Sequence, residues 1–317
     1  MNYIVIDLEW NQCPKGKEAE DIHLPFEIIE IGAVKLNSCR KTVAEFHSVI
    51  KPQVYHWIHN KTREIIHLDY SHLKEGARFP DAAREFFQWC GEDYQFCSWG
   101  NQDLMELQRN LKYYHLESLL PGPMEYYDVQ KLFSLDFEDG KSRKSLEYAI
   151  DFLELPKTEY FHQALSDARY AAAILKQIEE DCILRNFSID VYQNPKSKKE
   201  EIHIFYDNYE KFISREFDSK EDAIADREVN STHCPLCHKP AKKKIYWFSV
   251  NARRYFSVSI CPEHGYIKGK VRMKKTDEGK FYVEKTLSLI DEKDAKRILE
   301  KKELLCAKRR LHRKSIQ

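Results

Sequence analysis

Two acidic residues, Asp7 and Glu9, lie two positions apart in the run Ile6-Asp7-Leu8-Glu9-Trp10. The surrounding Val, Ile and Tyr residues predict a strand, whose two-residue period places both carboxylates on one face and Leu8 on the other. Two adjacent like charges are unfavourable unless something neutralises them, and carboxylate oxygens suit Mg²⁺ or Mn²⁺. The alternative is a hydrated strand end that binds no ion.

Two further acids open predicted helices. Asp103 follows a predicted strand over residues 94–99 and a turn at Gly100, and Asp167 lies in the first turn of a helix expected over residues 164–180. An acid in the first turn of a helix is favoured by the helix dipole, which is the structural alternative for both. His162 precedes Asp167 by five residues, and a histidine taken singly is more often a surface or core residue than a catalyst.

Taken together, these motifs resemble the DEDDh 3′–5′ exonucleases of the DnaQ-like superfamily. The resemblance is carried by Asp-x-Glu on the first strand, by Trp99-Gly100-Asn101-Gln102-Asp103, and by the His-x4-Asp pattern of residues 161–168. The run Ile31-Gly32-Ala33-Val34 is similar to the second strand of the family. The resemblance covers about residues 1–185 and implies an α/β fold with an RNase H-like mixed β-sheet flanked by helices.

Within the superfamily, the chain looks closest to the Eri/KapD-like exoribonucleases, which favours RNA over DNA as the substrate. This likeness rests on the segment from Pro52 to Thr62 and on Ser98-Trp99-Gly100, which leads into the second motif. The chain departs from the pattern where relatives have Thr-Gly-Ile, because it has Asn60-Lys61-Thr62 and the residues that follow. A 3′–5′ DNA exonuclease and a non-catalytic scaffold built on the exonuclease fold are the alternative functions.

The resemblance implies hydrolysis of phosphodiester bonds from the 3′ end with two Mg²⁺ or Mn²⁺ ions. Such a pair, about 3.5–4 Å apart, activates a water and relieves charge on the leaving oxygen. Asp7 would bridge the ions, with Glu9, Asp103 and Asp167 completing their shells. His162 would be the general base, because an imidazole titrates near neutrality, and Glu9 is counted with it among the catalytic residues.

Four residues are expected to contact the substrate. Leu8 and Trp10 lie beside the metal-binding strand and could stack on or wedge the terminal bases. Core packing is the alternative for Trp10. Thr62 and Asn101, in the segments that carry the resemblance, complete the predicted substrate-binding residues.

A second candidate metal site lies in the last third of the chain. Cys234-Pro235-Leu236-Cys237 and Cys261-Pro262-Glu263-His264 are two knuckles that offer three thiolates and one imidazole. This ligand set suits one tetrahedral Zn²⁺, and the closed shell predicts a structural ion in a small β-rich zinc ribbon. His233 and His238 are alternative ligands.

The net charge of the 317-residue chain is zero, but the charge is unevenly distributed. Residues 1–190, the predicted exonuclease domain, carry a net charge of −11, and residues 191–230, a predicted linker with a small strand and helix segment, carry −3. Residues 231–317, the predicted zinc-ribbon domain with a basic C-terminal helix, carry 23 basic and 9 acidic residues. This basic end, with its interleaved aromatic residues, favours nucleic-acid binding, and a protein partner docked on the ribbon is the alternative.

The nine cysteines are odd in number and irregular in spacing outside the knuckles, which argues against a disulfide framework. The N-terminal run lacks a basic region and a long apolar stretch, so we expect no signal peptide. No run approaches the roughly 18 apolar residues of a membrane span. These features predict a cytoplasmic protein with no membrane partner.

Overall fold

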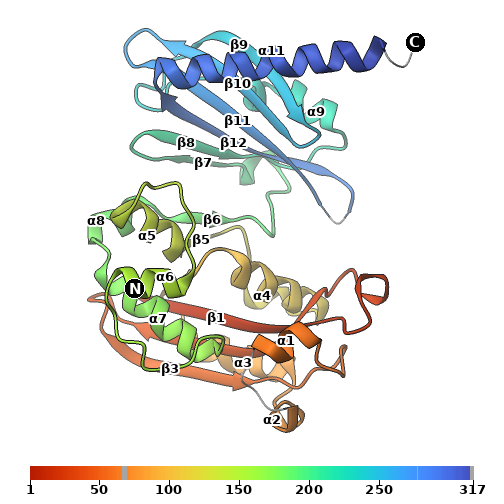
Figure 1. Ribbon diagram of the computed structural model, residues 1–317, viewed down its shortest axis with the longest axis vertical. Coiled ribbons are helices and arrows are strands. Elements are labelled where there is room, and N and C mark those ends of the chain that lie inside the picture. Colours follow the sequence, from red (N-terminus) through yellow and green to blue (C-terminus); the bar gives the residue numbers. More distant parts are fainter. Residues whose placement is uncertain (66–69, 277, 315–317) are drawn as a thin grey trace. The chain divides into compact units, whose positions relative to one another are not determined.

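The chain forms two compact units, Met1–Gln193 and Asn194–Gln317, each with its own β-sheet. The computed structural model describes residues 1–65, 70–276 and 278–314 (Figure 1). Within these ranges, no helix combines the length and the apolar character needed to cross a membrane.

Unit 1 is built on a mixed six-stranded sheet with the order β3-β2-β1-β4-β5-β6. Strand β1 pairs antiparallel with β2 and parallel with β4, and β4 pairs parallel with β5. The strands are β1 (Asn2–Gln12), β2 (Phe26–Leu36), β3 (Thr42–Val49), β4 (Tyr94–Ser98), β5 (Met124–Asp128) and β6 (Ser188–Asp190).

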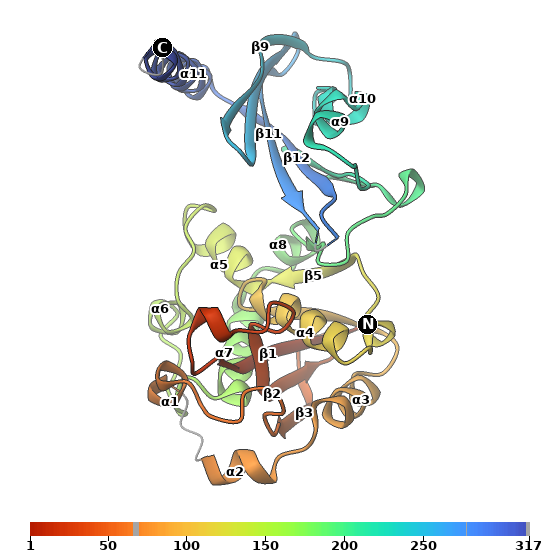
Figure 2. The same cartoon turned by 90° about the vertical axis from the view of Figure 1, so that its right-hand side faces the viewer.

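Helices cover both faces of this sheet (Figure 2). Ile4 and Ile6 of β1 pack against Leu107 of α4 and the apolar face of α3, whereas Val5 packs against Ile174 of α7 together with α5 and α6. The helices are α1 (Asn60–Ile65), α2 (Tyr70–Glu75), α3 (Phe79–Cys90), α4 (Gln102–Tyr113), α5 (Val129–Phe137), α6 (Leu146–Phe152), α7 (Ala164–Gln177) and α8 (Glu180–Arg185). A mixed sheet flanked by helices confirms the fold class predicted from the sequence.

The alternation of side chains along β1 decides where its two acids lie. Leu8 belongs to the core that contains α3 and α4. Because successive side chains of a strand point to opposite faces, Asp7 and Glu9 lie on the other face, which α7 covers. The register of β1 against β2 is regular as far as Glu9 and is interrupted by a bulge before Trp10.

Unit 2 contains an antiparallel six-stranded sheet with the order β7-β8-β12-β11-β10-β9. Helices α9 and α10 pack on one face through Ala223 and Val229, and α11 packs on the other through Ala295 and Ile298 (Figure 2). The elements are β7 (Ile202–Phe205), β8 (Tyr209–Ile213), α9 (Lys220–Ala225), α10 (Arg227–Asn230), β9 (Lys242–Asn251), β10 (Arg254–Cys261), β11 (Gly265–Lys275), β12 (Phe281–Ile290) and α11 (Glu292–Lys314). Short 3-10 turns are η1 (Lys17–Ala19), η2 (Glu117–Leu119) and η3 (Lys198–Glu200).

Residues 191–230, expected to form a linker with a small strand and helix segment, contribute the strands β7 and β8 to the second sheet. Strand β8 pairs with β12 from Tyr209, opposite Ser288, to Ile213, opposite Glu284. Phe212 is fully buried in the core of unit 2. The polar residues of this segment suggested a connector, but its apolar strand residues need the sheet to cover them. The structure therefore groups residues 194–230 with residues 231–317.

Candidate active site and metal centre

Asp103 lies beside the two acids of β1. Its Oδ1 accepts a hydrogen bond from the backbone N–H of Leu8 at 3.2 Å, and Leu8 is the residue between Asp7 and Glu9. The parallel pairing of β1 with β4 brings this about, because α4 begins directly after β4. Asp103 is only 5% exposed. The first two predicted motifs therefore meet at the same end of the sheet.

Gly32 allows α7 to bring the third motif to this place. It stands opposite Asp7 in the ladder between β1 and β2. A Cβ atom at Gly32 would lie 2.1 Å from the carbonyl carbon of Ala164 and from the backbone nitrogen of Leu165. Both are backbone atoms and cannot move aside, so only glycine allows the first turn of α7 to pack directly on β2. Asp167, in that turn, is thereby held over the acids of β1.

Glu9, His162 and Asp167 each place a potential ligand atom within 4.8 Å of the others. One carboxylate oxygen of Asp167, Oδ2, accepts the backbone N–H of His162 at 3.1 Å. The other, Oδ1, is buried and has no hydrogen-bond partner among the described residues. His162 has a φ of +64°, and its side chain is exposed. A buried carboxylate oxygen without a hydrogen-bond partner calls for a further partner, and a metal ion is one that would satisfy it.

Burial and mutual repulsion raise the pKa values of the four carboxyl groups. Burial, assisted by the charges of Asp167, Glu30 and Asp103, raises the pKa of Glu9 to about 8. Burial is also the main reason that the pKa is raised to about 7 at Asp103 and to about 6 at Asp167. The pKa of Asp7 is raised well above its ordinary range by burial and by the charges of Asp103 and Asp167. A bound divalent cation would reverse these shifts by neutralising the shared negative charge.

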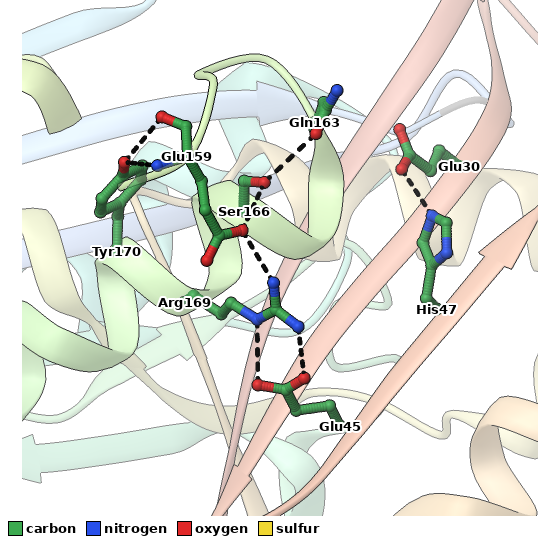
Figure 3. A network of polar contacts seen from close by, with 8 residues as sticks. All are labelled: Glu30, Glu45, His47, Glu159, Gln163, Ser166, Arg169 and Tyr170. Atoms are coloured by element: carbon green, nitrogen blue, oxygen red, sulfur yellow. Dashed lines mark hydrogen bonds and ion pairs between the residues drawn. The ribbon is translucent and has the colours of Figure 1, made fainter. Parts of the chain in front are cut away.

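A fifth carboxylate, Glu30, was not singled out from the sequence. It stands opposite Glu9 in the ladder and is 2% exposed. Its Oε1 lies 2.7 Å from Nε2 of His47 on β3, and its Oε2 has no hydrogen-bond partner among the described residues (Figure 3). The signal in the sequence is an acid that stands between Ile29 and Ile31 in the middle of β2.

A polar network around Glu159 ties the loop before α7 to its surroundings (Figure 3). The Glu159 carboxylate accepts hydrogen bonds from the Ser166 hydroxyl and from Arg169, both at 2.8 Å. Arg169 also binds both oxygens of Glu45 on β3, at 3.0 and 2.6 Å. The Tyr170 hydroxyl donates to the carbonyl oxygen of Glu159 and accepts its N–H. The loop with the candidate histidine is thus anchored by side chains of α7.

The four predicted substrate-binding residues differ in accessibility. Trp10 is partly exposed and packs against Phe26 with the ring centroids 5.8 Å apart, and Asn101 is exposed. Leu8 and Thr62 are only 3% and 6% exposed. The base contact expected of Leu8 does not fit this position, since strand alternation turns its side chain into the core. Thr62, on α1, is buried as well.

A buried asparagine fixes the loop that precedes α1. Asn11 donates to the carbonyl oxygens of Tyr55 and Trp57 at 3.2 and 2.9 Å, and it accepts the N–H of His59 at 2.9 Å. These bonds hold the loop to the end of β1, two residues beyond Glu9. The Trp57 side chain is 67% exposed. These hydrogen bonds could not be predicted from the sequence, in which Asn11 begins a polar stretch.

The four ligands predicted for zinc come together in unit 2. Their ligand atoms lie within 4.8 Å of one another. Sγ of Cys234 is 3.5 Å from Nδ1 of His264, Sγ of Cys261 is 3.7 Å from the same nitrogen, and Sγ of Cys237 is 3.7 Å from Sγ of Cys261. A tetrahedron with Zn–S bonds of about 2.3 Å has S–S edges of about 3.8 Å, so the spacing fits zinc.

The electrostatics of this cluster also favour a metal. Burial alone would raise the pKa of Cys261, but the backbone N–H groups of Glu263 and His264, with the His264 side chain, lower it to about 6. A thiolate is the form that binds metal. The two alternative histidines have other contacts, because His233 pairs with Glu210 and the His238 ring packs on Phe205.

The sequence profile of the exonuclease (RNase_T) family matches residues 4–175, more than half of the chain. The chain belongs to this exonuclease family. The match includes the five residues predicted to form the active site, Asp7, Glu9, Asp103, His162 and Asp167. The chain is accordingly a nuclease, a hydrolase of phosphodiester bonds, and the alternative of a non-catalytic scaffold is set aside.

The chain is also similar to individual proteins. The probable 3′-5′ exonuclease KapD of Bacillus subtilis (strain 168) is 27% identical over 179 residues, which cover 56% of this chain and 84% of that protein. The nuclease domain of 3′hExo, a DEDDh family member solved with rAMP bound, is 16% identical with a TM-score of 0.50, covering 60% of this chain and 96% of that one. Cell-death related nuclease 4 (CRN-4) is 16% identical with a TM-score of 0.47, over 59% of this chain and 65% of that one, slightly less than two thirds of its length.

Proposed function

We propose that this exonuclease degrades RNA from the 3′ end with two Mg²⁺ or Mn²⁺ ions and with His162 as the general base. The observation that carries the proposal is the convergence of four carboxylates and one exposed histidine from β1, α4 and the start of α7. No single structural role explains that convergence, because four desolvated acids at one place destabilise a fold that binds no cation.

The residues present fit a pair of divalent ions. Asp7 and Glu9 share one face of β1, Asp103 is aimed at that strand by its bond from Leu8, and Asp167 has an unpaired buried oxygen. Oxygen ligands of this kind are those that Mg²⁺ and Mn²⁺ prefer. The bound ions supply the charge that activates a water and stabilises the leaving 3′ oxygen.

The chain's own residues orient the substrate and move the proton. His162 is exposed on a loop anchored by the Glu159 network, next to Asp167, so it can take a proton from the attacking water. Trp10 is partly exposed and Asn101 is exposed at the same end of the sheet, and the exposed Trp57 is held beside β1 by Asn11. Aromatic side chains in these positions can stack on the terminal bases.

In unit 2, we infer that Cys234, Cys237, Cys261 and His264 hold one structural Zn²⁺. Four protein ligands leave no position open for substrate, which separates this site from a catalytic zinc site. The ion would join the turn before β9 to the turn between β10 and β11. The ion pair between Lys239 and Glu263 links the same two turns.

RNA is favoured over DNA by the likeness to the Eri/KapD-like group and by the ribonucleotide bound to the 3′hExo nuclease domain. We expect digestion of 5′-labelled single-stranded and stem-loop RNA, with Mg²⁺ or Mn²⁺, to give a ladder shortened from the 3′ end. Matched DNA should be digested more slowly, by about tenfold or more, if the site binds the 2′-hydroxyl. A faster ladder on DNA would assign the enzyme to DNA instead.

A further inference from the structure

Four cations crowd one face of the unit 2 sheet. Arg254 of β10 stands directly opposite Arg272 of β11, and Lys270 and Lys268 follow at alternate positions of β11. Residues that pair across antiparallel strands share a face, as do alternate residues of one strand. We call these four residues the cationic face. Like charges directly opposite each other on neighbouring strands destabilise a sheet, so their placement needs a reason.

The cationic face has little compensating negative charge. Burial and the three other cations lower the pKa of Lys270. The acid nearest in register, Glu284 of β12, stands opposite Arg272 but forms its ion pair with Lys274, at 3.5 Å. In the part of the chain that the structure describes, none of the four cations forms an ion pair with an acid. A polyanion from outside would supply the missing charge.

Helix α11 adds to this face. The ring of Phe256 on β10 has Nζ of Lys268 at 5.4 Å on β11 and Nζ of Lys301 at 5.2 Å on α11. Further along α11, Arg309 donates a hydrogen bond to the carbonyl oxygen of Ser249 at 2.6 Å. Helix α11 contacts β9, β10 and β11, and Lys301 and Arg309 are the basic side chains that it places against these strands.

We propose that the cationic face binds the phosphate backbone of single-stranded RNA at a site separate from the active site. The cations of β11 recur at every second residue, about 6.8 Å apart in an extended strand, which suits the regular charges of an extended phosphodiester chain. Their charge is complementary to such a chain, and residues 231–317 carry 23 basic and 9 acidic residues. The choice of RNA rests on the proposed function. An acidic protein segment is the other polyanion that the test must separate.

The test is the binding of a fluorescein-labelled 20-mer of uridine to the full chain, measured by anisotropy over a range of KCl concentrations. The buffer contains no Mg²⁺, Mn²⁺ or chelator, so zinc is retained. The variant R254Q/K270Q/R272Q should bind about 10²-fold more weakly at 0.1 M salt. The slope of log K against log salt should fall by about 2, since three phosphate contacts are lost at about 0.7 each.

The matched control, K198Q/K199Q/K220Q, removes three cations from η3 and from α9, which covers the opposite face. It should bind RNA within about twofold of the wild type with an unchanged slope. The first variant should also unfold at no lower temperature than the wild type, because repulsion is relieved. Wild-type affinity and slope in R254Q/K270Q/R272Q would overturn the proposal and favour an acidic protein as the partner.

A separate assay of hydrolysis tests the proposed function. A nitrophenyl ester of a single nucleotide has no phosphate chain to occupy the cationic face, and R254Q/K270Q/R272Q should hydrolyse it with the wild-type kcat in Mg²⁺. If neither protein hydrolyses the ester or RNA, the exonuclease proposal fails, while the anisotropy comparison still decides the cationic face.

Discussion

Asp103→Asn should abolish nuclease activity and at the same time stabilise the protein without Mg²⁺. The substitution removes a carboxylate from the metal-binding set, and such ligands supply several kcal/mol of transition-state stabilisation, so we expect a loss of about 10³-fold or more in kcat. The Asn side chain keeps an oxygen that can accept the Leu8 N–H. The substitution also removes a charge whose burial is unfavourable. This cost is reflected in the pKa of Asp103, which burial raises to about 7.

The gain in stability should depend on pH. Below about pH 3, Asp103 is protonated in the folded and the unfolded chain, and its pKa shift has no effect on stability. Between pH 4 and 7, the unfolded chain loses the proton first, so the folded wild type loses stability relative to the unfolded state as the pH rises. Urea unfolding should therefore favour the variant by about 1–3 kcal/mol at pH 8 and by roughly a third of that difference at pH 5. Mg²⁺ should stabilise the wild type more than the variant.

Asp81→Asn is the matched control, because Asp81 is also an acid in the first turn of a helix, α3, but is exposed and outside the cluster. It should lose about 0.3–1 kcal/mol of stability through the helix dipole and keep full activity. If Asp103→Asn behaves in the same way, Asp103 is an ordinary helix N-terminal acid and the metal site is not formed as proposed.

The second large effect is expected from Cys234→Ser. Structural zinc contributes about 10–16 kcal/mol of apparent binding free energy in small domains, so loss of one thiolate should release the ion and unfold much of unit 2. Cys234 is fully buried beside Ile267 and Leu287, so the turn that carries it cannot move without exposing these apolar side chains. We expect about one zinc per wild-type chain and far less in the variant by atomic absorption. Limited proteolysis should remove residues beyond about 194 and leave unit 1 intact.

Cys306→Ser, on α11 of the same unit, is the control, since Cys306 lies outside the four-ligand cluster. It should keep its zinc and resist proteolysis. A wild-type chain that contains no zinc and whose unit 2 unfolds at the same temperature with and without a chelator would refute the structural zinc site.

Much of the candidate active site could be predicted from the sequence because its signals are local. The two-residue spacing of Asp7 and Glu9 fixes a common face in any strand. The strand, turn and helix around Asp103, and the short loop from His162 to Asp167, are likewise readable from neighbouring residues. The knuckle spacing similarly predicted a cluster of Cys and His side chains, which the structure forms.

The remaining features depend on pairings between distant segments. Glu30 joins the acids only because β2 pairs with β1 in one register, and Gly32 matters only because α7 packs there. Burial of Leu8 follows from the helix pair that covers its face. The boundary at residue 193 depends on the pairing of β8 with β12, which composition does not reveal.

The central claim is that the carboxylate cluster of unit 1 is a metal-dependent active site for 3′ ends. Its most direct test is product analysis of 5′-labelled single-stranded RNA incubated with the wild type and with Asp7→Asn. The wild type should release nucleoside 5′-monophosphates one at a time from the 3′ end with Mg²⁺ and stop when Mg²⁺ is omitted, whereas Asp7→Asn should release none. Release that is independent of divalent ions, or that is unchanged in Asp7→Asn, would contradict the account.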